Sequence, residues 1–375
     1  MFWENIIIKN NGLISVYLLT MNLVSKKIEL KGMSLREMEV YFESIGEKKF
    51  RASQVFNWMY NNFATNIDKM LNIPNSLKAK LEEKTTLHTL KLNDVQHSST
   101  TDTKKFLFKT YDNHSIETVF IPDGKRNTLC VSTQIGCPLD CKFCATGLMG
   151  YTRNLSVGEI VDQYILSAVE VGGDKITNIV YMGMGEPLLN FNNTLKSVSL
   201  FTNEFARPIS RNRLTVSTSG IPNKIIELAD SPYRVKLALS LHSVFEDIRS
   251  KIMPINIKYS LSENVDAIRY YSRTTKTSIT FEYTMLDGIN DRAEDVKALT
   301  KLCRSLPSKL NVIPFNSIAH MSPEGISSEL EPTSRTRIND FVAQLRENNI
   351  TVLVRDTQGD DIAAACGQLA VKEIL

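Results

Sequence analysis

Three closely spaced cysteines constrain this chain more than any other feature. The segment CPLDCKFCATG at residues 137–147 places Cys137, Cys141 and Cys144 at the spacing C-x3-C-x2-C. A structural zinc site would need a second pair of cysteines to complete a tetrahedron, and the sequence has no such pair. Three thiolates instead suit a four-iron cluster in which one iron keeps an open coordination position. The spacing therefore predicts an iron–sulfur site that can bind a further ligand.

The overall composition is typical of a soluble globular protein. Of 375 residues, 42% are hydrophobic and 23% are charged, and 44 basic residues against 41 acidic residues give a net charge of +3. The overall charge therefore gives no sign of nucleic-acid binding, and any such site must be a local basic surface. Six cysteines in a chain of this length indicate intracellular thiols rather than a disulfide framework, so we expect a cytoplasmic protein.

Residues 1–32 are expected to be an extension outside the fold, either a disordered tail or the product of an upstream start codon. Their apolar run LISVYLLTMNLV, from Leu13 to Val24, is too short to span a bilayer. Little charge precedes this run and no small-residue cleavage site follows it, which argues against a signal peptide. We therefore expect no membrane attachment.

Residues 33–100 are predicted to form a small helical domain. The segment SLRE (34–37) has the pattern of a capping box and precedes an apolar helical face. The basic residues of the domain are Lys48, Lys49, Arg51, Lys78, Lys80 and Lys84. Such residues form either a solvated face or a surface that contacts phosphates, and the sequence leaves both interpretations open.

Residues 101–127 are predicted to form a β-hairpin. The β-rich runs KKFLFKT (104–110) and SIETVFIP (115–122) flank an Asp-Asn turn. Glu117 is unusual because apolar residues occupy both faces of its strand. A carboxylate in such a strand costs free energy unless it is paired or functional. Glu117 is therefore expected either to form a salt bridge or to belong to a site.

From Thr128 onward, predicted strands alternate with predicted helices. The strands are 128–134, 176–183, 213–218, 235–241, 278–286, 309–314 and 351–355. The helices follow the capping box SVGE (156–159) and lie near 191–203, 222–229, 261–272, 292–305 and 334–347. This alternation indicates a parallel sheet with crossover helices over residues 128–357, followed by a C-terminal segment, 358–375. In such folds the site lies at the carboxyl ends of the strands.

Polar residues that follow these strands are candidates for ligand binding. Gly185 and Glu186 end a glycine-rich turn, where the backbone can approach a ligand and a carboxylate can accept from an ammonium group. The ends of later strands carry Ser217, Ser240, His242 and Asn316. Taken alone, the turn is a weak signal, and His242 would more often be a satisfied core or capping histidine.

Three further cysteines lie outside the cluster motif. Cys130 stands on the strand just before the cluster loop, and it is either a buried thiol or a further cluster ligand. Cys366 stands beside Gly367 near the end of the chain, in surroundings that suit a mobile nucleophile better than a core residue. Cys303 lies within a predicted helix and is expected to be a small buried hydrophobe.

Taken together, these motifs resemble those of the RlmN/Cfr family of radical S-adenosylmethionine (SAM) RNA methyltransferases. The resemblance covers about residues 33–370. It rests on the ordered motifs IGEKKFRASQVFNWMY, CVSTQIGCPLDCKFCATG, YMGMGEPLLN, VSTSGI, ALSLHS, MPIN, MLDGIND and GDDIAAACGQLA. The form MGMGEPLLN, which contains Pro187, is more similar to RlmN than to Cfr.

The resemblance implies an α/β fold: a partial (β/α)6 radical SAM barrel, a small N-terminal helical domain that contacts RNA, and a connecting β-hairpin. It implies that the three motif cysteines ligate a 4Fe–4S cluster whose open iron binds SAM. The implied lining of the SAM site is Gly185, Glu186, Ser217, Ser240, Leu241, His242 and Asn316. By position, Cys366 resembles the methyl carrier of the family, Cys130 its resolving partner and Glu117 its proton acceptor.

The implied reaction methylates carbon 2 of an adenine in 23S ribosomal RNA and of the adenine beside the anticodon of some transfer RNAs. Carbon 2 is electron-poor and cannot attack an ordinary SAM methyl group, so two SAM molecules are consumed. One SAM methylates Cys366, and cleavage of the other gives a radical that activates this methyl group for addition to the ring. Cys130 then attacks the sulfur of Cys366, which releases the product and leaves a disulfide. A flavodoxin-type reductant would renew the cluster and the thiols, and a monomer is expected.

Three alternatives stay open on the sequence alone. A Cfr-type enzyme that methylates carbon 8 would share nearly all of these motifs. A radical SAM enzyme that acts on a protein or small molecule would share the cluster motif, but the Cys130/Cys366 pair and the basic helical domain argue against it. A non-enzymatic RNA-binding protein with a structural metal is the third alternative.

Overall fold

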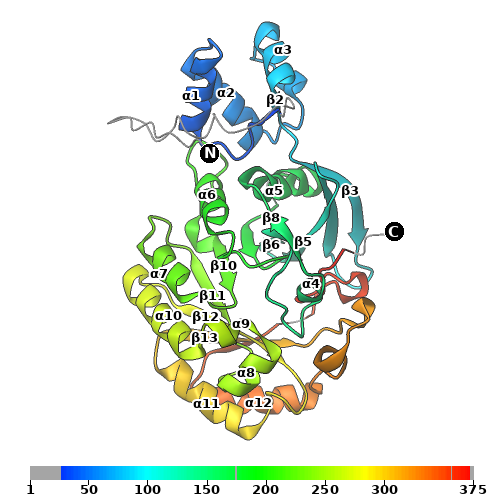
Figure 1. The fold of residues 1–375 in the computed structure, drawn as a ribbon, viewed down its shortest axis with the longest axis vertical. Coiled ribbons are helices and arrows are strands. Elements are labelled where there is room, and N and C mark those ends of the chain that lie inside the picture. The colour runs from blue at the N-terminus through cyan, green and yellow to red at the C-terminus, as the bar shows by residue number, and fades with distance from the viewer. Residues whose placement is uncertain (1–26, 174, 356, 372–375) are drawn as a thin grey trace, which may run out of the picture.

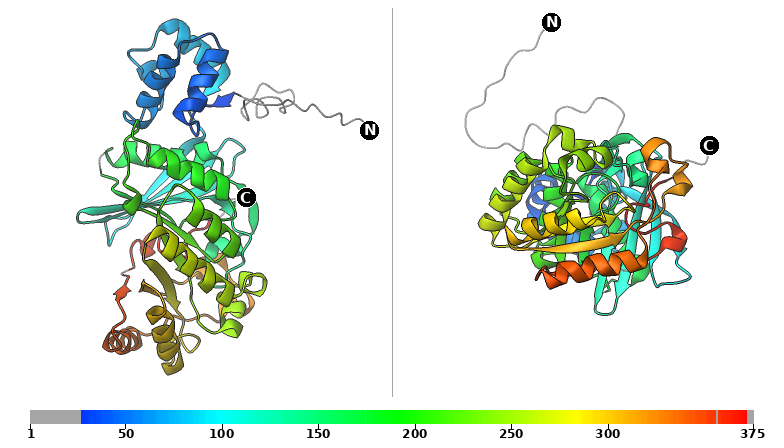
Figure 2. Two further views of the ribbon diagram at one scale, coloured as in Figure 1. Left: turned by 90° about the vertical axis from the view of Figure 1, so that its left-hand side faces the viewer. Right: turned by 90° about the horizontal axis from the view of Figure 1, so that it is seen from below.

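The computed structural model describes residues 27–173, 175–355 and 357–371. A helical unit stands at one end of an α/β body, as Figures 1 and 2 show. The apolar run from Leu13 to Val24 lies outside the described residues. None of the helices within the described ranges has the length and apolar character that crossing a membrane requires.

The body is built on one open sheet of ten strands, in the order β14-β13-β12-β11-β10-β9-β6-β5-β4-β3. Neighbouring strands from β6 to β14 run parallel. These strands are β6 (Arg126–Cys130), β9 (Asn178–Tyr181), β10 (Leu214–Thr218), β11 (Lys236–Ser240), β12 (Ile279–Met285), β13 (Ser308–Pro314) and β14 (Val352–Val354). Because the two edge strands are not paired with each other, the sheet is a partial barrel, as predicted.

Crossover helices connect the parallel strands and lie outside the curved sheet (Figure 2). They are α5 (Val157–Val171), α6 (Phe191–Phe201), α7 (Pro222–Asp230), α10 (Leu261–Thr275), α11 (Ala293–Arg304) and α12 (Arg335–Glu347). The predicted capping box before α5 is present, with reciprocal hydrogen bonds between Ser156 and Glu159. The short helices α8 (Glu246–Ile252) and α9 (Ile255–Lys258), which the sequence did not predict, fill the connection from β11 to α10.

The predicted hairpin is confirmed, and it extends the barrel sheet. Its strands β4 (Lys104–Thr110) and β5 (Ser115–Asp123) pair antiparallel, and β5 pairs with β6. A further strand, β3 (Leu90–His97), forms the edge of the sheet. These residues were predicted to belong to the helical domain, because the apolar alternation of Leu90 and Leu92 stops after Leu92 within a largely polar run.

The predicted strand 128–134 is interrupted. β6 ends at Cys130, and a separate strand β7 (Gln134–Gly136) pairs with β8 (Tyr151–Asn154) outside the main sheet. The chain leaves the sheet between these strands, although residues 131–133 are buried. This departure is what carries the cysteine loop over the end of the barrel.

The helical unit begins earlier in the chain than predicted. It contains β1 (Ile28–Glu29), α1 (Leu35–Ser44), α2 (Lys49–Tyr60), α3 (Asn75–Lys84) and β2 (Thr85–Thr86). The capping box that precedes α1 forms as predicted. β1 pairs with β2, and Leu30 is fully buried, so residues 28–32 belong to the fold rather than to an extension. Short 3₁₀ helices lie at Ile67–Lys69, Arg211–Arg213, Ala319–Met321, Gly325–Ser328 and Asp360–Ile362.

A buried polar network joins the helical unit to the barrel. Asp162 on α5 is paired with Lys31, and both side chains are completely buried. The other carboxylate oxygen of Asp162 accepts hydrogen bonds from the Thr89 amide at 2.9 Å, the Thr89 hydroxyl at 2.8 Å and the Leu90 amide at 3.1 Å. One carboxylate on α5 thus satisfies donors from the segment after β1 and from the start of β3.

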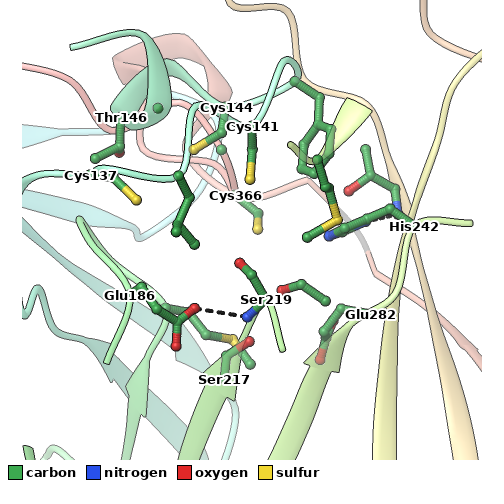
Figure 3. A pocket seen from close by; sticks show the side chains of 18 of the residues that line it. Cys137, Cys141, Cys144, Thr146, Glu186, Ser217, Ser219, His242, Glu282 and Cys366 are labelled. Atoms are coloured by element: carbon green, nitrogen blue, oxygen red, sulfur yellow. Dashed lines mark hydrogen bonds between the residues drawn. The ribbon is translucent and has the colours of Figure 1, made fainter. Parts of the chain in front are cut away.

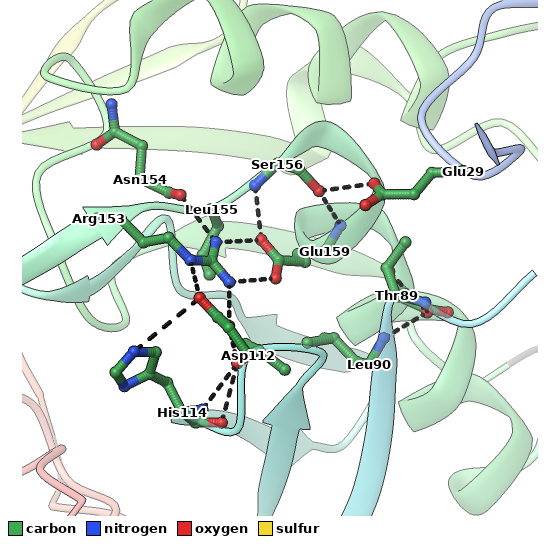
Figure 4. A network of polar contacts seen from close by, with 12 residues as sticks. Glu29, Thr89, Leu90, Asp112, His114, Arg153, Asn154, Leu155, Ser156 and Glu159 are labelled. Carbon is green, nitrogen blue, oxygen red and sulfur yellow. Dashed lines mark hydrogen bonds and ion pairs between the residues drawn. The ribbon is translucent and has the colours of Figure 1, made fainter. Parts of the chain in front are cut away.

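A second network lies beside the first and ties the hairpin to the same helix (Figure 4). The Arg153 guanidinium donates to Asp112 in the β4–β5 turn at 2.7 Å and to Glu159 on α5 at 2.8 Å. Because these pairs are bidentate, they fix orientation as well as distance. α5 is therefore the common support of the helical unit, the hairpin and the barrel.

We predict that Asp162→Ala destabilises the protein by about 3–5 kcal/mol, because it leaves the Lys31 ammonium buried without a partner. Denaturant unfolding would measure the change. The matched control is Asp266→Ala, which removes an exposed partner of Arg269 and should change stability by no more than about 1 kcal/mol. Equal effects of the two substitutions would show that the buried network does not hold the units together.

Candidate active site

A cavity opens at the carboxyl ends of the parallel strands, where the β-α alternation predicted the site (Figure 3). The predicted residues that line it are Cys137, Cys141, Cys144, Gly185, Glu186, Ser217, Ser240, His242 and Cys366. In Figure 3 the sulfur atoms of the motif cysteines and of Cys366 face the same space. The fold therefore gathers groups from the cluster loop, from the ends of β9, β10 and β11, and from the C-terminal segment.

The cluster loop is held in shape by backbone contacts. The Cys137 amide donates to the Gly150 carbonyl at 2.7 Å, and the Cys144 amide donates to the Cys141 carbonyl at 3.1 Å. Gly136 has φ +71°, and a Cβ at this position would stand 1.9 Å from the Gly150 carbonyl oxygen, so only glycine fits. Cys144 then begins the short helix α4 (Ala145–Leu148).

The three motif thiols fit a metal cluster rather than a free reactive cysteine. Burial raises the pKa of all three, that of Cys137 to about 12. Bare thiols in this position would stay protonated and inert, and a bound metal would displace their protons. Within the described ranges, no three Cys, His or acidic side chains are close enough to hold a single ion. Three separate thiolates suit a four-iron cluster, because each of them binds its own iron.

Glu186 is oriented by its own loop. It is nearly fully buried, and its carboxylate accepts from the Leu188 amide at 3.0 Å and from the Ser219 amide at 2.8 Å. The Glu186 amide in turn donates to the Gln134 side chain at 2.8 Å. Burial raises the pKa of Glu186, and these backbone donors oppose the increase. A carboxylate fixed in this way presents its remaining acceptor capacity to a ligand ammonium group.

His242 lies in the cavity wall as a neutral imidazole. Burial lowers its pKa to about 3, and the nearby Arg249 adds to this effect. Its Nδ1 accepts from the Thr284 amide at 3.0 Å, so the proton is on Nε2. The ring packs against Phe143 of the cluster loop, with centroids 4.5 Å apart. His242 is therefore hydrogen-bonded within the fold and also lines the cavity. The sequence had offered these two roles as alternatives, and the structure combines them.

Arg249 organises the strand ends and was not predicted. Its guanidinium is completely buried and donates to the carbonyls of Ser219 at 2.6 Å, Ser240 at 3.0 Å and Leu241 at 3.1 Å. The side chain of Leu241 is buried outside the cavity lining, so its contribution is this backbone contact. The interaction between Arg249 and Cys141 favours a thiolate at that position, which also suits a cluster. The sequence carries no signal that distinguishes Arg249 from a surface residue such as Lys251 in the same segment.

The C-terminal segment that carries Cys366 is anchored on both sides of that residue. The Ala145 amide donates to the Gly367 carbonyl at 2.7 Å, and the Asn316 side chain donates to the Cys366 carbonyl at 3.0 Å. Further upstream, Asp361 accepts from the Ser99 amide at 2.7 Å. The Cys366 side chain is accessible from the cavities, but because these cavities lie deep in the protein, the loss of solvation raises its pKa to about 11. Cys366, which was predicted to be a mobile nucleophile, thus lies in a segment that hydrogen bonds connect to the cluster loop and to the loop after β13.

Cys130 lines a second cavity, which occupies the barrel interior and is also lined by Cys366. Asn316 lines this second cavity as well, whereas it was predicted to line the SAM site. Burial raises the pKa of Cys130 to about 12, and the neighbouring Cys366 contributes to the increase. The Arg355 guanidinium lies near both thiols and lowers both pKa values. All six cysteines are free, so the structure contains no disulfide between Cys130 and Cys366.

Glu117 stands outside the lining of both cavities. Its carboxylate forms a buried salt bridge with Lys105 at 3.0 Å and accepts from the Ala370 amide at 3.0 Å. Burial raises its pKa, although Lys105 opposes the increase. The sequence offered a salt bridge or a functional site, and the structure has the salt bridge together with a contact to the Cys366 segment.

Comparisons with known proteins agree with this site. Residues 28–87 match the ribosomal RNA large subunit methyltransferase N-terminal domain, and residues 131–302 match the radical SAM superfamily. A probable dual-specificity RNA methyltransferase RlmN from Thermotoga sp. (strain RQ2) is 41% identical over 92% of this chain and 98% of its own length. The dual-specificity RNA methyltransferase RlmN of Marinomonas sp. (strain MWYL1) is also 41% identical, over 92% of this chain and 93% of its own length.

The chain belongs to the RlmN family. A solved radical SAM methyltransferase from Sphaerobacter thermophilus shares the fold, with a TM-score of 0.86 and 39% identity over 91% of this chain and 99% of that chain. The protein is thus a radical SAM RNA methyltransferase, and its cofactors are a 4Fe–4S cluster and SAM. As a member of the RlmN family it has an enzymatic function, which excludes the non-enzymatic alternative.

We predict that Gly185→Ala weakens SAM binding at least tenfold, or by about 1.4 kcal/mol. Gly185 has φ +93°, and a Cβ there would stand 2.4 Å from the Cβ of Gln134, the residue that positions Glu186. Gly288→Ala is the matched control, because Gly288 also has a positive φ, +67°, but open space around it. Equilibrium dialysis of cluster-loaded enzyme with labelled SAM would compare them. Similar losses in both variants would attribute the effect to backbone strain alone.

Proposed function

We propose that this enzyme methylates carbon 2 of an adenine in large-subunit ribosomal RNA and in transfer RNA, with Cys366 as the methyl carrier. The observation that supports this proposal most strongly is the position of Cys366. It shares a cavity with the three motif cysteines, although it comes from the opposite end of the catalytic domain. The similar proteins are named dual-specificity RNA methyltransferases, which supports RNA as the substrate and more than one target.

The motif cysteines are proposed to hold the 4Fe–4S cluster, and SAM would lie between it and the strand ends. Glu186, with its fixed carboxylate, would accept hydrogen bonds from the SAM ammonium group. Ser217, Ser240 and the Nε2–H of His242 would bind other polar groups of SAM. When bound, the cluster and SAM supply the one-electron chemistry that makes an unreactive methyl group able to attack an electron-poor ring.

Two SAM molecules are expected per turnover, because Cys366 must first receive a methyl group and that group must then be activated. Methylation of Cys366 requires its thiolate. The Arg355 guanidinium favours this form by lowering a pKa that burial has raised. The hydrogen bonds to the carbonyls of Cys366 and Gly367 would keep the methylated sulfur directed toward the cavity and restrict its motion.

Cys130 is proposed to release the product by attacking the sulfur of Cys366. Both thiols line the same cavity, and Arg355 lies near both, where its charge opposes the increase in their pKa values. The attack joins the two sulfurs in a transient disulfide and breaks the bond between the Cys366 sulfur and the methylene carbon. The electron pair of that bond passes to the methylene carbon and the adenine ring, and the carbon takes up a proton to become the methyl group of the released product. A flavodoxin-type reductant is expected to supply electrons to the cluster.

Glu117 is proposed to accept the proton that the adenine loses. Its raised pKa suits a general base better than an ordinary carboxylate. To reach the adduct, the carboxylate must release the Ala370 amide, so proton transfer would be coupled to movement of the Cys366 segment.

The helical unit is proposed to contact RNA through surface lysines whose internal ion pairs are weak enough to be exchanged. Lys80 pairs with Glu47 at 2.6 Å, and Lys49 lies 3.5 Å from Glu43 in an exposed pair. Exposed pairs of this kind are weak, so these lysines can exchange a carboxylate for a phosphate.

We predict that Cys130→Ala traps a covalent adduct between Cys366 and the RNA, because the bond to the base forms but the resolving thiol is missing. Denaturing gel electrophoresis with labelled RNA would detect it. Cys303→Ala is the matched control, since Cys303 is also a buried free thiol but lies in α11, away from both cavities. Release of free product by the Cys130 variant at the normal rate would eliminate the proposed resolving role.

We predict that Glu117→Gln slows adduct resolution more than SAM cleavage. The amide oxygen of glutamine can still accept from Ala370, so the segment keeps its anchor while the base is lost. Single-turnover assays would follow 5′-deoxyadenosine and methylated RNA separately. If SAM cleavage falls more than resolution, Glu117 acts on the cofactor site and not as the proton acceptor.

The proposed substrate position is tested by digesting RNA that was methylated in vitro and identifying the methyladenosine isomer by mass spectrometry. The proposal requires 2-methyladenosine. An 8-methyladenosine product would make the enzyme Cfr-type, and SAM cleavage without RNA methylation would indicate a different substrate.

A further inference from the structure

The interior of the barrel is a cavity with its own mouth, at the end opposite the cluster. Its lining begins with residues from the starts of strands: Arg126 is the first residue of β6, Lys236 the first of β11, and Lys309 the second of β13. Arg126 and Lys236 are exposed at the surface. In a closed eight-stranded barrel, layers of side chains fill this space. The open sheet of this protein leaves it accessible.

The mouth is positively charged. Among the described residues that line this cavity, four are basic and two are acidic: Arg126, Lys236, Lys309 and Arg355 against Asp123 and Glu282. The cations are close enough to act on one another, because Lys309 and Arg126 both contribute to lowering the pKa of Lys236, after the larger effect of burial. A cleft lined by one sign of charge concentrates ions of the opposite sign.

The inner end of this cavity leads to the two proposed reactive thiols. Cys130 lines only this cavity, whereas Cys366, Arg355 and Glu282 line both cavities and form part of the wall between them. A molecule that enters from the mouth therefore meets Cys130 and Cys366 without passing the cluster. A reductant protein is too large for this route, because the thiols lie inside the barrel.

We propose that the mouth formed by Arg126, Lys236 and Lys309 is an anion-selective entrance through which a small thiol bearing carboxylate or sulfonate groups reaches Cys130 and Cys366. The use of this entrance rests on the proposed function, in which Cys130 and Cys366 are left joined by a disulfide after each turnover. The entrance allows the thiols to be renewed from the barrel end opposite the cluster.

The renewal step is an ordinary thiol–disulfide exchange. The thiolate of one small molecule attacks the Cys130 sulfur, the bond between Cys130 and Cys366 breaks, and Cys366 leaves as a thiolate. A second small thiol attacks the mixed disulfide and releases Cys130. Two small thiols supply two electrons and two protons, and they end as one disulfide.

The entrance is tested by the charge preference of thiol labelling. Cluster-loaded enzyme with SAM bound would be treated anaerobically with the anionic sulfonatoethyl or the cationic trimethylammonioethyl methanethiosulfonate, and peptide mass spectrometry would follow Cys130. Relative to a neutral methyl methanethiosulfonate standard, the anionic reagent should label Cys130 on the order of tenfold faster than the cationic one. Equal labelling by the two reagents would overturn the proposal.

Variants identify the residues responsible. Lys236→Glu combined with Lys309→Glu should reverse the preference, and the milder Lys309→Gln should reduce it if the double variant does not fold. Lys297→Glu is the matched control, because Lys297 is an exposed residue of α11 outside the cavity and should leave the preference unchanged. If both variants still label faster with the anionic reagent, the charge selectivity does not come from the mouth residues, and the proposed entrance is refuted.

The use of the entrance is tested on enzyme oxidised by one turnover. Anionic 2-mercaptoethanesulfonate should restore the Cys130 and Cys366 thiols faster than cationic cysteamine, at equal thiolate concentrations, and Lys309→Gln should narrow the difference. Equal rates would refute the renewal route. If turnover leaves no disulfide, the proposed role of Cys130 fails, and the labelling experiment still decides whether the anion-selective entrance exists.

Discussion

The hydrogen bond from the Ala145 amide to the Gly367 carbonyl joins two parts of the site that lie far apart in the chain. It connects the helix that follows the cluster motif to the residue after Cys366. A second contact between the same segments, from the Thr146 hydroxyl to the Leu369 carbonyl at 2.5 Å, reinforces it. Without these bonds Cys366 would have no defined place, and the proposed role of this residue as methyl carrier requires it to lie within reach of both the cofactor and the base.

The sequence predicted the architecture well, because its signals are local. Alternating apolar runs, capping boxes and turn residues marked the parallel strands, the crossover helices and the hairpin. The failures have physical causes. β3 is a polar edge strand whose pairing depends on β4, and residues 28–32 fold because Lys31 finds Asp162, far away in sequence. Neither the β3–β4 pairing nor the Lys31–Asp162 ion pair produces a recognisable pattern in the local sequence.

The sequence motifs identified the cluster cysteines and several other residues that line the cluster cavity, but they could not identify the groups that support them. Arg249, Arg355 and Glu282 are charged residues inside the body, and each acts through neighbours that the fold provides. An isolated arginine in a helix or after a strand is indistinguishable from a surface residue in the sequence. Glu282 offered a signal of the same kind as Glu117, a carboxylate within an apolar strand, and it was overlooked. Buried charges of this type become informative only when their partners are known.

The central claim is that the methyl group passes through Cys366 and is activated there. The most direct test uses SAM with a trideuterated methyl group and counts the deuterium atoms in the methyladenosine product by mass spectrometry. Because one hydrogen is taken from the methyl group while Cys366 carries it, the account predicts that two of the three deuterium atoms arrive in the RNA. Transfer of all three would show that the methyl group moves intact, and it would contradict the role of Cys366 as a radical carrier.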